Sequence, residues 1–281
     1  METHVEDIRE QQRMTWNKFS PGWKKWDEFT MNFLKPMGDA IIKSLELKDH
    51  DEVLDIAAGT GEPGLTIAGL IPNGKVTGTD LAEDMLAIAA ENAEIKGLRN
   101  YETLITDVCE LPFEEDTFDA ISCRMGFMFF PDMMLAARQM YRVLKFDGKL
   151  STSVWDGPQH NDWITTIMSV IQKHIATPSP EPGAPGMFRC AEPDLISNLF
   201  NRVGFKNIVT QQVRGKVDYL SFDRYWEIML DIGAPIVAAL SGADKTTIAK
   251  IREEVSELFK SKNKEGEATL EYAALVVSAV K

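Results

Sequence analysis

One apolar run in this chain ends on an acid and passes directly into a glycine-rich turn. Residues 53–64 are Val-Leu-Asp-Ile-Ala-Ala-Gly-Thr-Gly-Glu-Pro-Gly. An apolar run of this length is typical of a buried parallel strand, and the glycines allow backbone amides of the turn to approach a ligand. The segment therefore predicts the first strand of an α/β fold, with a ligand-binding turn at the carboxyl end of that strand.

The glycines alone are compatible with two classes of cofactor. Gly59, Gly61 and Gly64 match the G-x-G-x-x-G spacing of a dinucleotide-binding turn, which would indicate NAD. Asp55 argues against that interpretation, because an acid at the entrance of the turn repels a pyrophosphate. A sulfonium cofactor carries an amino group and no phosphate, so it tolerates the acid. The turn therefore favours S-adenosylmethionine.

Two more acids follow strand-like segments further along the chain. Residues 74–79 are followed by Asp80, where a carboxylate suits the two hydroxyls of a ribose. Residues 101–106 are followed by Asp107. A carboxylate at Asp107 suits the exocyclic amine of adenine, a contact for which NAD-binding folds have no regular need. Each acid taken alone is as compatible with a helix cap or a solvated turn. Because all three acids end separate strand-like segments, we interpret them as one ligand site.

The order of these motifs along the chain is also informative. The turn from Asp55 to Gly64 is followed by Asp80, by Asp107-Val108 with Leu-Pro-Phe at 111–113, and by Phe-Asp-Ala-Ile-Ser-Cys-Arg at 118–124. This order resembles that of the class I S-adenosylmethionine-dependent methyltransferases, above all the branch typified by the ubiquinone and menaquinone C-methyltransferases. The resemblance covers about residues 10–155. The resemblance indicates the fold and the cofactor, but it does not identify the methyl acceptor.

The resemblance implies where the cofactor binds. It implies backbone contacts at Ala57, Gly59 and Arg124, and an N-terminal segment that folds over the methionine end. Together with the acids described above, the expected cofactor-binding residues are Trp16, Trp23, Asp55, Ala57, Gly59, Thr60, Gly61, Asp80, Leu81, Met85, Asp107, Val108 and Arg124.

Arg124 departs from the pattern of the branch, in which a small polar residue often stands at this position. Three roles are open for its side chain. The first is to pair with the carboxylate of the cofactor, the second is to orient an acidic substrate, and the third is to form a structural salt bridge.

The segment that follows residue 124 is apolar and aromatic. Residues 125–130 are Met-Gly-Phe-Met-Phe-Phe. Such a surface suits an apolar or planar acceptor and a sulfonium charge over aromatic faces, while packing in the core is the alternative for many of these side chains. We expect the substrate to contact Phe127, Met128, Trp163, Phe188 and Trp226.

His160 is the best candidate for a catalytic general base. It follows the strand expected at 149–155 by a few residues, and a histidine accepts a proton near neutral pH. His174, Tyr219, Tyr225 and Asp162 are alternatives, and a thiolate, thioether or activated carbon acceptor needs no base. Methyl transfer from a sulfonium is an in-line displacement, so no metal ion is expected.

Strand-like and helix-like segments alternate from residue 52 onward. This alternation predicts an α/β fold, a Rossmann-like seven-stranded sheet that is mostly parallel with an antiparallel last strand. Pro21-Gly22 is expected to break the helical segment before the sheet. The expected division is a helical cap at 1–50, a cofactor-binding core at 51–156, a lid insertion at 157–190 with a proline-rich loop at 177–186, a core continuation at 191–221, a second helical insertion at 222–264 and the last strand at 265–281.

Charge and composition narrow the range of partners. A formal net charge of -13 argues against a nucleic-acid substrate, because a polyanion would meet an acidic surface. The sequence has no apolar run of membrane-spanning length, no signal-peptide segment within residues 1–13, and three scattered cysteines without C-x-x-C spacing. We therefore expect a cytoplasmic protein, with exposed aromatic side chains of the lid able to support a homodimer.

The sequence thus predicts a methyltransferase that uses S-adenosylmethionine and acts on a small, apolar or aromatic metabolite. One alternative is a noncatalytic S-adenosylmethionine-binding or assembly protein whose second insertion binds a partner. The other is an NAD-dependent oxidoreductase, which Asp55 and Asp107 together disfavour.

Overall fold

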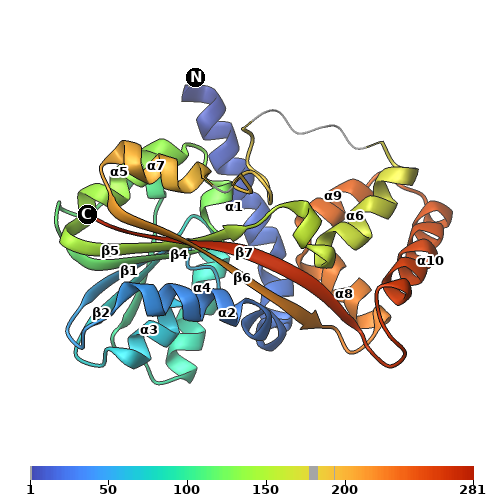
Figure 1. Cartoon of the computed structure of the whole chain (residues 1–281), viewed down its shortest axis with the longest axis horizontal. Helices are drawn as coiled ribbons and strands as arrows, with labels where there is room; N and C mark the ends of the chain where they lie inside the picture. Colours follow the sequence, from blue (N-terminus) through green and yellow to red (C-terminus); the bar gives the residue numbers. More distant parts are fainter. Residues whose placement is uncertain (1, 177–182, 193) are drawn as a thin grey trace.

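The computed structural model of the chain describes residues 2–176, 183–192 and 194–281, so residues 177–182 of the expected proline-rich loop lie outside it. Seven strands form one sheet in the order β3-β2-β1-β4-β5-β7-β6 (Figure 1). Only β7 runs antiparallel to its neighbours, which confirms the expected α/β fold. The strands are β1 Glu52–Ile56, β2 Lys75–Asp80, β3 Tyr101–Ile105, β4 Phe118–Arg124, β5 Leu144–Trp155, β6 Lys206–Asp218 and β7 Thr269–Val280.

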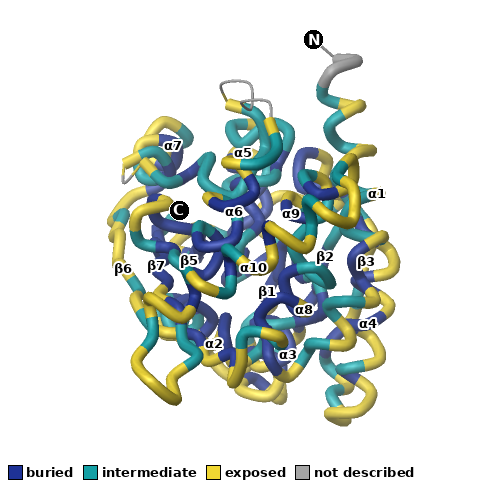
Figure 2. Tube along the Cα trace, turned by 90° about the vertical axis from the view of Figure 1, so that its right-hand side faces the viewer, coloured by how far each residue is buried: buried dark blue, intermediate teal, exposed yellow. Residues whose placement is uncertain are grey.

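Helices cover both faces of the sheet because successive strand residues point to opposite sides. Val53 of β1 is buried with Ile41 and Leu65, whereas its neighbour Leu54 is buried in the other cluster with Met140. Figure 2 shows the central strands buried beneath helices whose outer sides are exposed. The helices against the sheet are α2 Asp27–Leu45, α3 Gly64–Leu70, α4 Glu83–Ile95, α5 Met133–Val143 and α7 Leu195–Val203, with 3-10 turns at Val108–Glu110, Phe127–Phe129 and Pro158–His160.

Four further helices gather at one end of the long β6–β7 ribbon (Figure 1). They are α6 Asp162–His174, α8 Phe222–Ile232, α9 Ala234–Leu240 and α10 Lys245–Ser261. Tyr225 of α8 stacks on Phe259 of α10 with ring centroids 5.1 Å apart. Within the expected core continuation at 191–221, the sequence predicts a strand at 206–213, and the observed β6 is longer because its pairing with β7 continues to Asp218 opposite Thr269. Helix α9 was not expected from the sequence.

The expected helix break at Pro21-Gly22 is wrong. Helix α1 runs from Glu2 to Lys25 with Pro21 inside it. Proline removes the N–H that would bond the Asn17 carbonyl, but the Ser20 hydroxyl donates to that carbonyl instead, at 2.8 Å. Although α1 has 24 residues, neither it nor any other helix in the described part of the chain is apolar enough to cross a membrane.

Helix α1 bridges two distant parts of the molecule. At α4, the Asn17 side chain accepts a hydrogen bond from the Asp84 amide at 3.1 Å. At α8, Lys25 pairs with Glu227 and Asp231, both at 2.7 Å. Such exposed ion pairs contribute little stability each, but together these contacts fix where the helix lies. This position places α1 over the carboxyl ends of the parallel strands.

Candidate active site

Asp55 holds the glycine-rich turn from the inside. Its side chain is fully buried, Oδ1 accepts from the Ser122 hydroxyl at 2.6 Å, and Oδ2 accepts from the Gly64 amide at 3.1 Å. A Cβ atom on Gly64 would lie 2.7 Å from Oδ2, which is why this position needs glycine. Burial raises the pKa of Asp55 to about 7, while the hydrogen bond from Ser122 opposes the shift. Neither Asp55 nor Gly61 lines the cavity described below.

Asp80, at the end of β2, joins that turn to the start of α4. Oδ2 accepts from the Gly59 amide at 3.0 Å, and Oδ1 accepts from the Ala82 amide at 2.9 Å. Gly59 has a φ of +57°, which turns its N–H toward the carboxylate. Burial raises the pKa of Asp80, while the two backbone hydrogen bonds oppose the shift. Each carboxylate oxygen retains a lone pair for a ribose hydroxyl.

Asp107 lies beyond β3 and is covered by α1. Its Oδ1 accepts from the Cys109 amide at 2.8 Å, and its Oδ2 lies 2.5 Å from Nε of Arg9. Arg9 also pairs with Glu110 at 2.9 Å. The adenine end expected at Asp107 is therefore closed from above by the first turns of α1.

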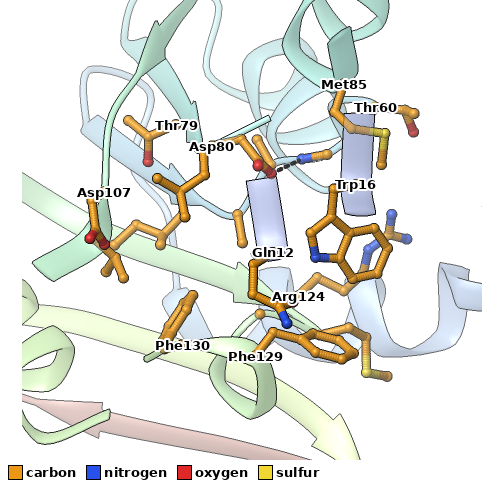
Figure 3. A pocket seen from close by; sticks show the side chains of 18 of the residues that line it. Gln12, Trp16, Thr60, Thr79, Asp80, Met85, Asp107, Arg124, Phe129 and Phe130 are labelled. Atoms are coloured by element: carbon orange, nitrogen blue, oxygen red, sulfur yellow. Dashed lines mark hydrogen bonds between the residues drawn. The ribbon is translucent and has the colours of Figure 1, made fainter. Parts of the chain in front are cut away.

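A cavity lies at the carboxyl ends of β1, β2 and β4, beneath α1 (Figure 3). The Trp16 indole meets the Phe129 ring edge-on at 5.2 Å and the Trp23 indole at 6.2 Å. Of the expected cofactor-binding residues, those lining the cavity are Trp16, Trp23, Ala57, Gly59, Thr60, Asp80, Leu81, Met85, Asp107, Val108 and Arg124.

Met125, Gly126, Phe129 and Phe130 also line the cavity, and they belong to the apolar run at 125–130 that was expected at the site. The lining residues missed from the sequence are Gln12, Leu34, Ile56, Ala58, Glu62, Thr79, Thr106 and Pro131. The spacing of Gln12 from Trp16 and Trp23 predicts that it lies at the same site. Gln12 precedes Trp16 by four residues and Trp23 by eleven, so all three lie on one helical face.

None of the residues expected to contact the substrate lines the cavity. Phe127 and Met128 are fully buried in the core, because the 3-10 turn directs Phe129 and Phe130 to the cavity instead. Trp163 and Trp226 are buried in the same core cluster, and Phe188 packs against it. The structure gives all five side chains packing roles.

The candidate bases also lie apart from the cavity. His160 Nδ1 lies 3.0 Å from Asp156 Oδ2, and His174 lies 2.9 Å from Glu254. Asp162 pairs with Lys262 at 2.8 Å, Tyr225 donates to the Trp163 carbonyl at 3.0 Å, and Tyr219 is fully buried. In the described part of the chain, the cavity is lined by only four charged residues, which are Glu62, Asp80, Asp107 and Arg124.

Comparison with known proteins identifies the family. A model of the methyltransferase domain matches residues 53–148. A demethylmenaquinone methyltransferase of Listeria monocytogenes is 31% identical in an alignment of 183 positions that covers 59% of this chain and 75% of that protein. The chain belongs to the class I S-adenosylmethionine-dependent methyltransferases. A demethylmenaquinone methyltransferase of Staphylococcus carnosus is 28% identical in an alignment of 187 positions that covers 63% of this chain and 77% of that protein, in keeping with the quinone methyltransferase branch.

Solved structures agree with the methyltransferase fold. The YcgJ protein of Bacillus subtilis superposes with a TM-score of 0.57 at 20% identity, over 87% of this chain and 97% of that one. A Haemonchus contortus phosphoethanolamine N-methyltransferase in complex with S-adenosylmethionine gives 0.52 at 20% identity, over 87% and 52%. The [4+2]-cyclase SpnF gives 0.53 at 21% identity, over 87% and 79%. Because one of these neighbours is a cyclase, the likeness shows the fold and not the reaction.

The cavity of this methyltransferase fits its cofactor. S-adenosylmethionine carries a sulfonium and an ammonium, which suit a wall lined by Glu62, Asp80 and Asp107. The same acids would repel the pyrophosphate of NAD. Within the described ranges, no three His, Cys, Asp or Glu side chains come together as ligands for a metal ion.

Proposed function

We propose that this methyltransferase acts on a small, apolar or aromatic metabolite. The observation that carries the proposal is the aromatic wall of the cavity, in which Phe129 meets Trp16 edge-on beside Trp23. Aromatic faces bind planar rings and stabilise a neighbouring sulfonium charge. The two sequence relatives named above are demethylmenaquinone methyltransferases, which supports an acceptor of this kind.

When bound, S-adenosylmethionine supplies an electrophilic methyl group on sulfur. Asp80 is positioned to bind the ribose hydroxyls, Asp107 and Val108 to bind the adenine, and the Gly59-Thr60 turn to bind the methionine portion. Trp16 and Trp23 exclude water from the place where the methyl group is transferred. The protein contributes alignment and desolvation, which are the main requirements of an in-line displacement.

We also propose that residues 1–50 act as the cap of this site, and that the insertion at 222–264 supports the cap. Side chains of α1 line the cavity, and α1 is tied to α8 through Lys25. The helices of the two insertions contribute no residue to the cavity wall among those the structure describes.

Asp80→Asn tests the cofactor site. The amide loses the negative charge and one of the two acceptor oxygens that hold Gly59 and Ala82, so we expect S-adenosylhomocysteine to bind at least about tenfold more weakly, as for loss of a charged hydrogen bond. Calorimetric titration measures this.

Asp84→Asn is the matched control, because Asp84 is exposed and lies four residues further along the chain without lining the cavity. We expect it to bind S-adenosylhomocysteine like the unchanged protein. Equal affinity in both variants, or saturable binding of NAD, would contradict the placement of the cofactor. A screen of aromatic acceptors with release of S-adenosylhomocysteine as the signal then tests the acceptor class.

A further inference from the structure

Arg124 is a cation in the cavity, and no described residue forms an ion pair or a side-chain hydrogen bond with it. It is the last residue of β4, and its side chain lines the cavity together with Trp16 (Figure 3). Among the residues that the structure describes, its side chain makes no hydrogen bond and has no acid within ion-pair distance. A structural salt bridge, one of the three roles open from the sequence, is therefore excluded for this part of the chain.

Two of the acids whose charges act on Arg124, Glu62 and Asp55, are paired with other groups. Glu62 pairs with Lys96 at 3.2 Å and accepts two hydrogen bonds from Thr66, at 3.1 Å from the amide and 2.6 Å from the hydroxyl. Asp55 is held by Ser122 and Gly64, as described above. Burial lowers the pKa of Arg124, and the negative charges of Glu62, Asp55 and Asp27 oppose that shift only from a distance.

Arg124 is half-buried, and a guanidinium partly withdrawn from water costs free energy unless hydrogen bonds replace those of the solvent. Its planar donors match a carboxylate or another anionic oxygen. Since the protein provides no such group at Arg124, a ligand that carries one would be bound there with a charge-assisted hydrogen bond.

We propose that Arg124 binds an anionic oxygen of the methyl acceptor, so that this enzyme selects aromatic or apolar acids over neutral molecules of the same shape. The inference rests on the proposed function. The chain runs from Arg124 directly into Met125 and Phe129, which belong to the wall assigned to the acceptor. An aromatic body against Phe129 thus places its acidic oxygen at the guanidinium.

The cavity supports an anionic acceptor in a second, independent way. No histidine, lysine, cysteine or tyrosine lines it among the described residues, and the candidate bases lie elsewhere. An acceptor that arrives already deprotonated does not require a general base. Arg124 would stabilise that deprotonated form.

The rival occupant of Arg124 is the carboxylate of the cofactor itself. The test compares S-adenosylhomocysteine with 5′-methylthioadenosine, which lacks the amino-acid end, in the unchanged protein and in Arg124→Gln. We expect each ligand to bind both proteins within about twofold, because the substitution leaves the backbone at 124 in place. A loss of tenfold or more for S-adenosylhomocysteine alone would assign the guanidinium to the cofactor and overturn the proposal.

The second arm compares 2-naphthoate with 2-naphthamide, which share a ring system and differ in charge, on the complex with S-adenosylhomocysteine. We expect naphthoate to bind at least tenfold more tightly than naphthamide, Arg124→Gln to abolish this preference, and Arg124→Lys to retain part of it. Equal binding of the two probes to the unchanged protein would overturn the role of Arg124 and leave the aromatic acceptor standing. Binding of neither probe would overturn the proposed function, and this inference with it.

Discussion

At the scale of single residues, Asp55 of the glycine-rich segment has a structural role in the fold. Asp55 was expected at the ligand, yet its carboxylate is buried beneath the turn between Ser122 and Gly64. A buried carboxyl group with a pKa of about 7 is held in its neutral form at a pH where the unfolded chain ionises it. The stability of the turn therefore depends on pH through a group that does not line the cavity.

The stability of Asp55→Asn should show this dependence. Between the ordinary pKa of 3.8 and the folded value of about 7, the folded protein binds a proton that the unfolded chain has released, so stability falls as the pH rises through that range. Asparagine has no charge to desolvate. We expect the variant to gain about 2–4 kcal/mol in unfolding free energy at pH 8 and to match the unchanged protein at pH 4. Urea denaturation at the two pH values measures the difference. An equal loss of stability at both would contradict the shifted pKa.

The sequence predicted the acids that line the cavity better than it predicted the aromatic side chains that line it. Asp80 and Asp107 were found because each follows an apolar strand, and parallel strands bring their carboxyl ends to one edge. Phe127 and Phe129 have the same chemistry two positions apart. Only the 3-10 turn decides that Phe127 faces the core and Phe129 the cavity, and no periodicity of the sequence encodes that turn.

At the scale of elements, helix α1 continues through a position where the helix propensities of its residues predict a break. Pro21 and Gly22 are both poor residues for a helix interior, so a break was expected. The Ser20 hydroxyl compensates for the missing amide, and Gly22 is required because α8 approaches so closely that a Cβ atom would collide with the Asp231 carbonyl. Such a tertiary contact is not visible in the local sequence. The ends of β1 and α5 depend on local patterns, and the sequence predicts them within one residue, as a strand at 53–56 and a helix at 133–143.

Gly22→Ala tests the contact between α1 and α8. Alanine is the better helix former, yet its methyl group must displace Asp231, so we expect a loss of about 1–3 kcal/mol in unfolding free energy, the usual cost of overpacking. The affinity for S-adenosylhomocysteine should fall as well, because α1 covers the cavity. Chemical denaturation and calorimetry measure the two effects.

Gly242→Ala is the matched control, because a Cβ atom at Gly242 meets no other atom within 4 Å. We expect it to change the unfolding free energy by less than about 0.5 kcal/mol. If Gly22→Ala were as stable as this control, the close packing of α1 on α8 would be refuted.

At the scale of the whole molecule, α1 links the cofactor cavity to the helices at the far end of the β6–β7 ribbon. It touches α4 through Asn17 and α8 through Lys25. We therefore expect a ligand that is bound beneath α1 to stabilise α8 as well, although α8 does not line the cavity.

Hydrogen exchange measures this coupling. With saturating S-adenosylhomocysteine, we expect slower amide exchange in α1 and in α8, and no change in α7, which packs mainly against α5 and β6. Protection of α1 without α8 would show that the link through Lys25 and Gly22 does not transmit the effect of the ligand.

The place of β7 also has a consequence for synthesis of the chain. β7 is made after β6, yet it lies between β5 and β6 and pairs with both. Strand β6 therefore has no partner in the sheet until β7, which begins at Thr269, has been translated. During that interval the edge of β5 is open to pairing with other chains. A ribosome that stalls before Thr269 carries a nascent protein whose cofactor half is complete in sequence and whose sheet still has an unpaired edge.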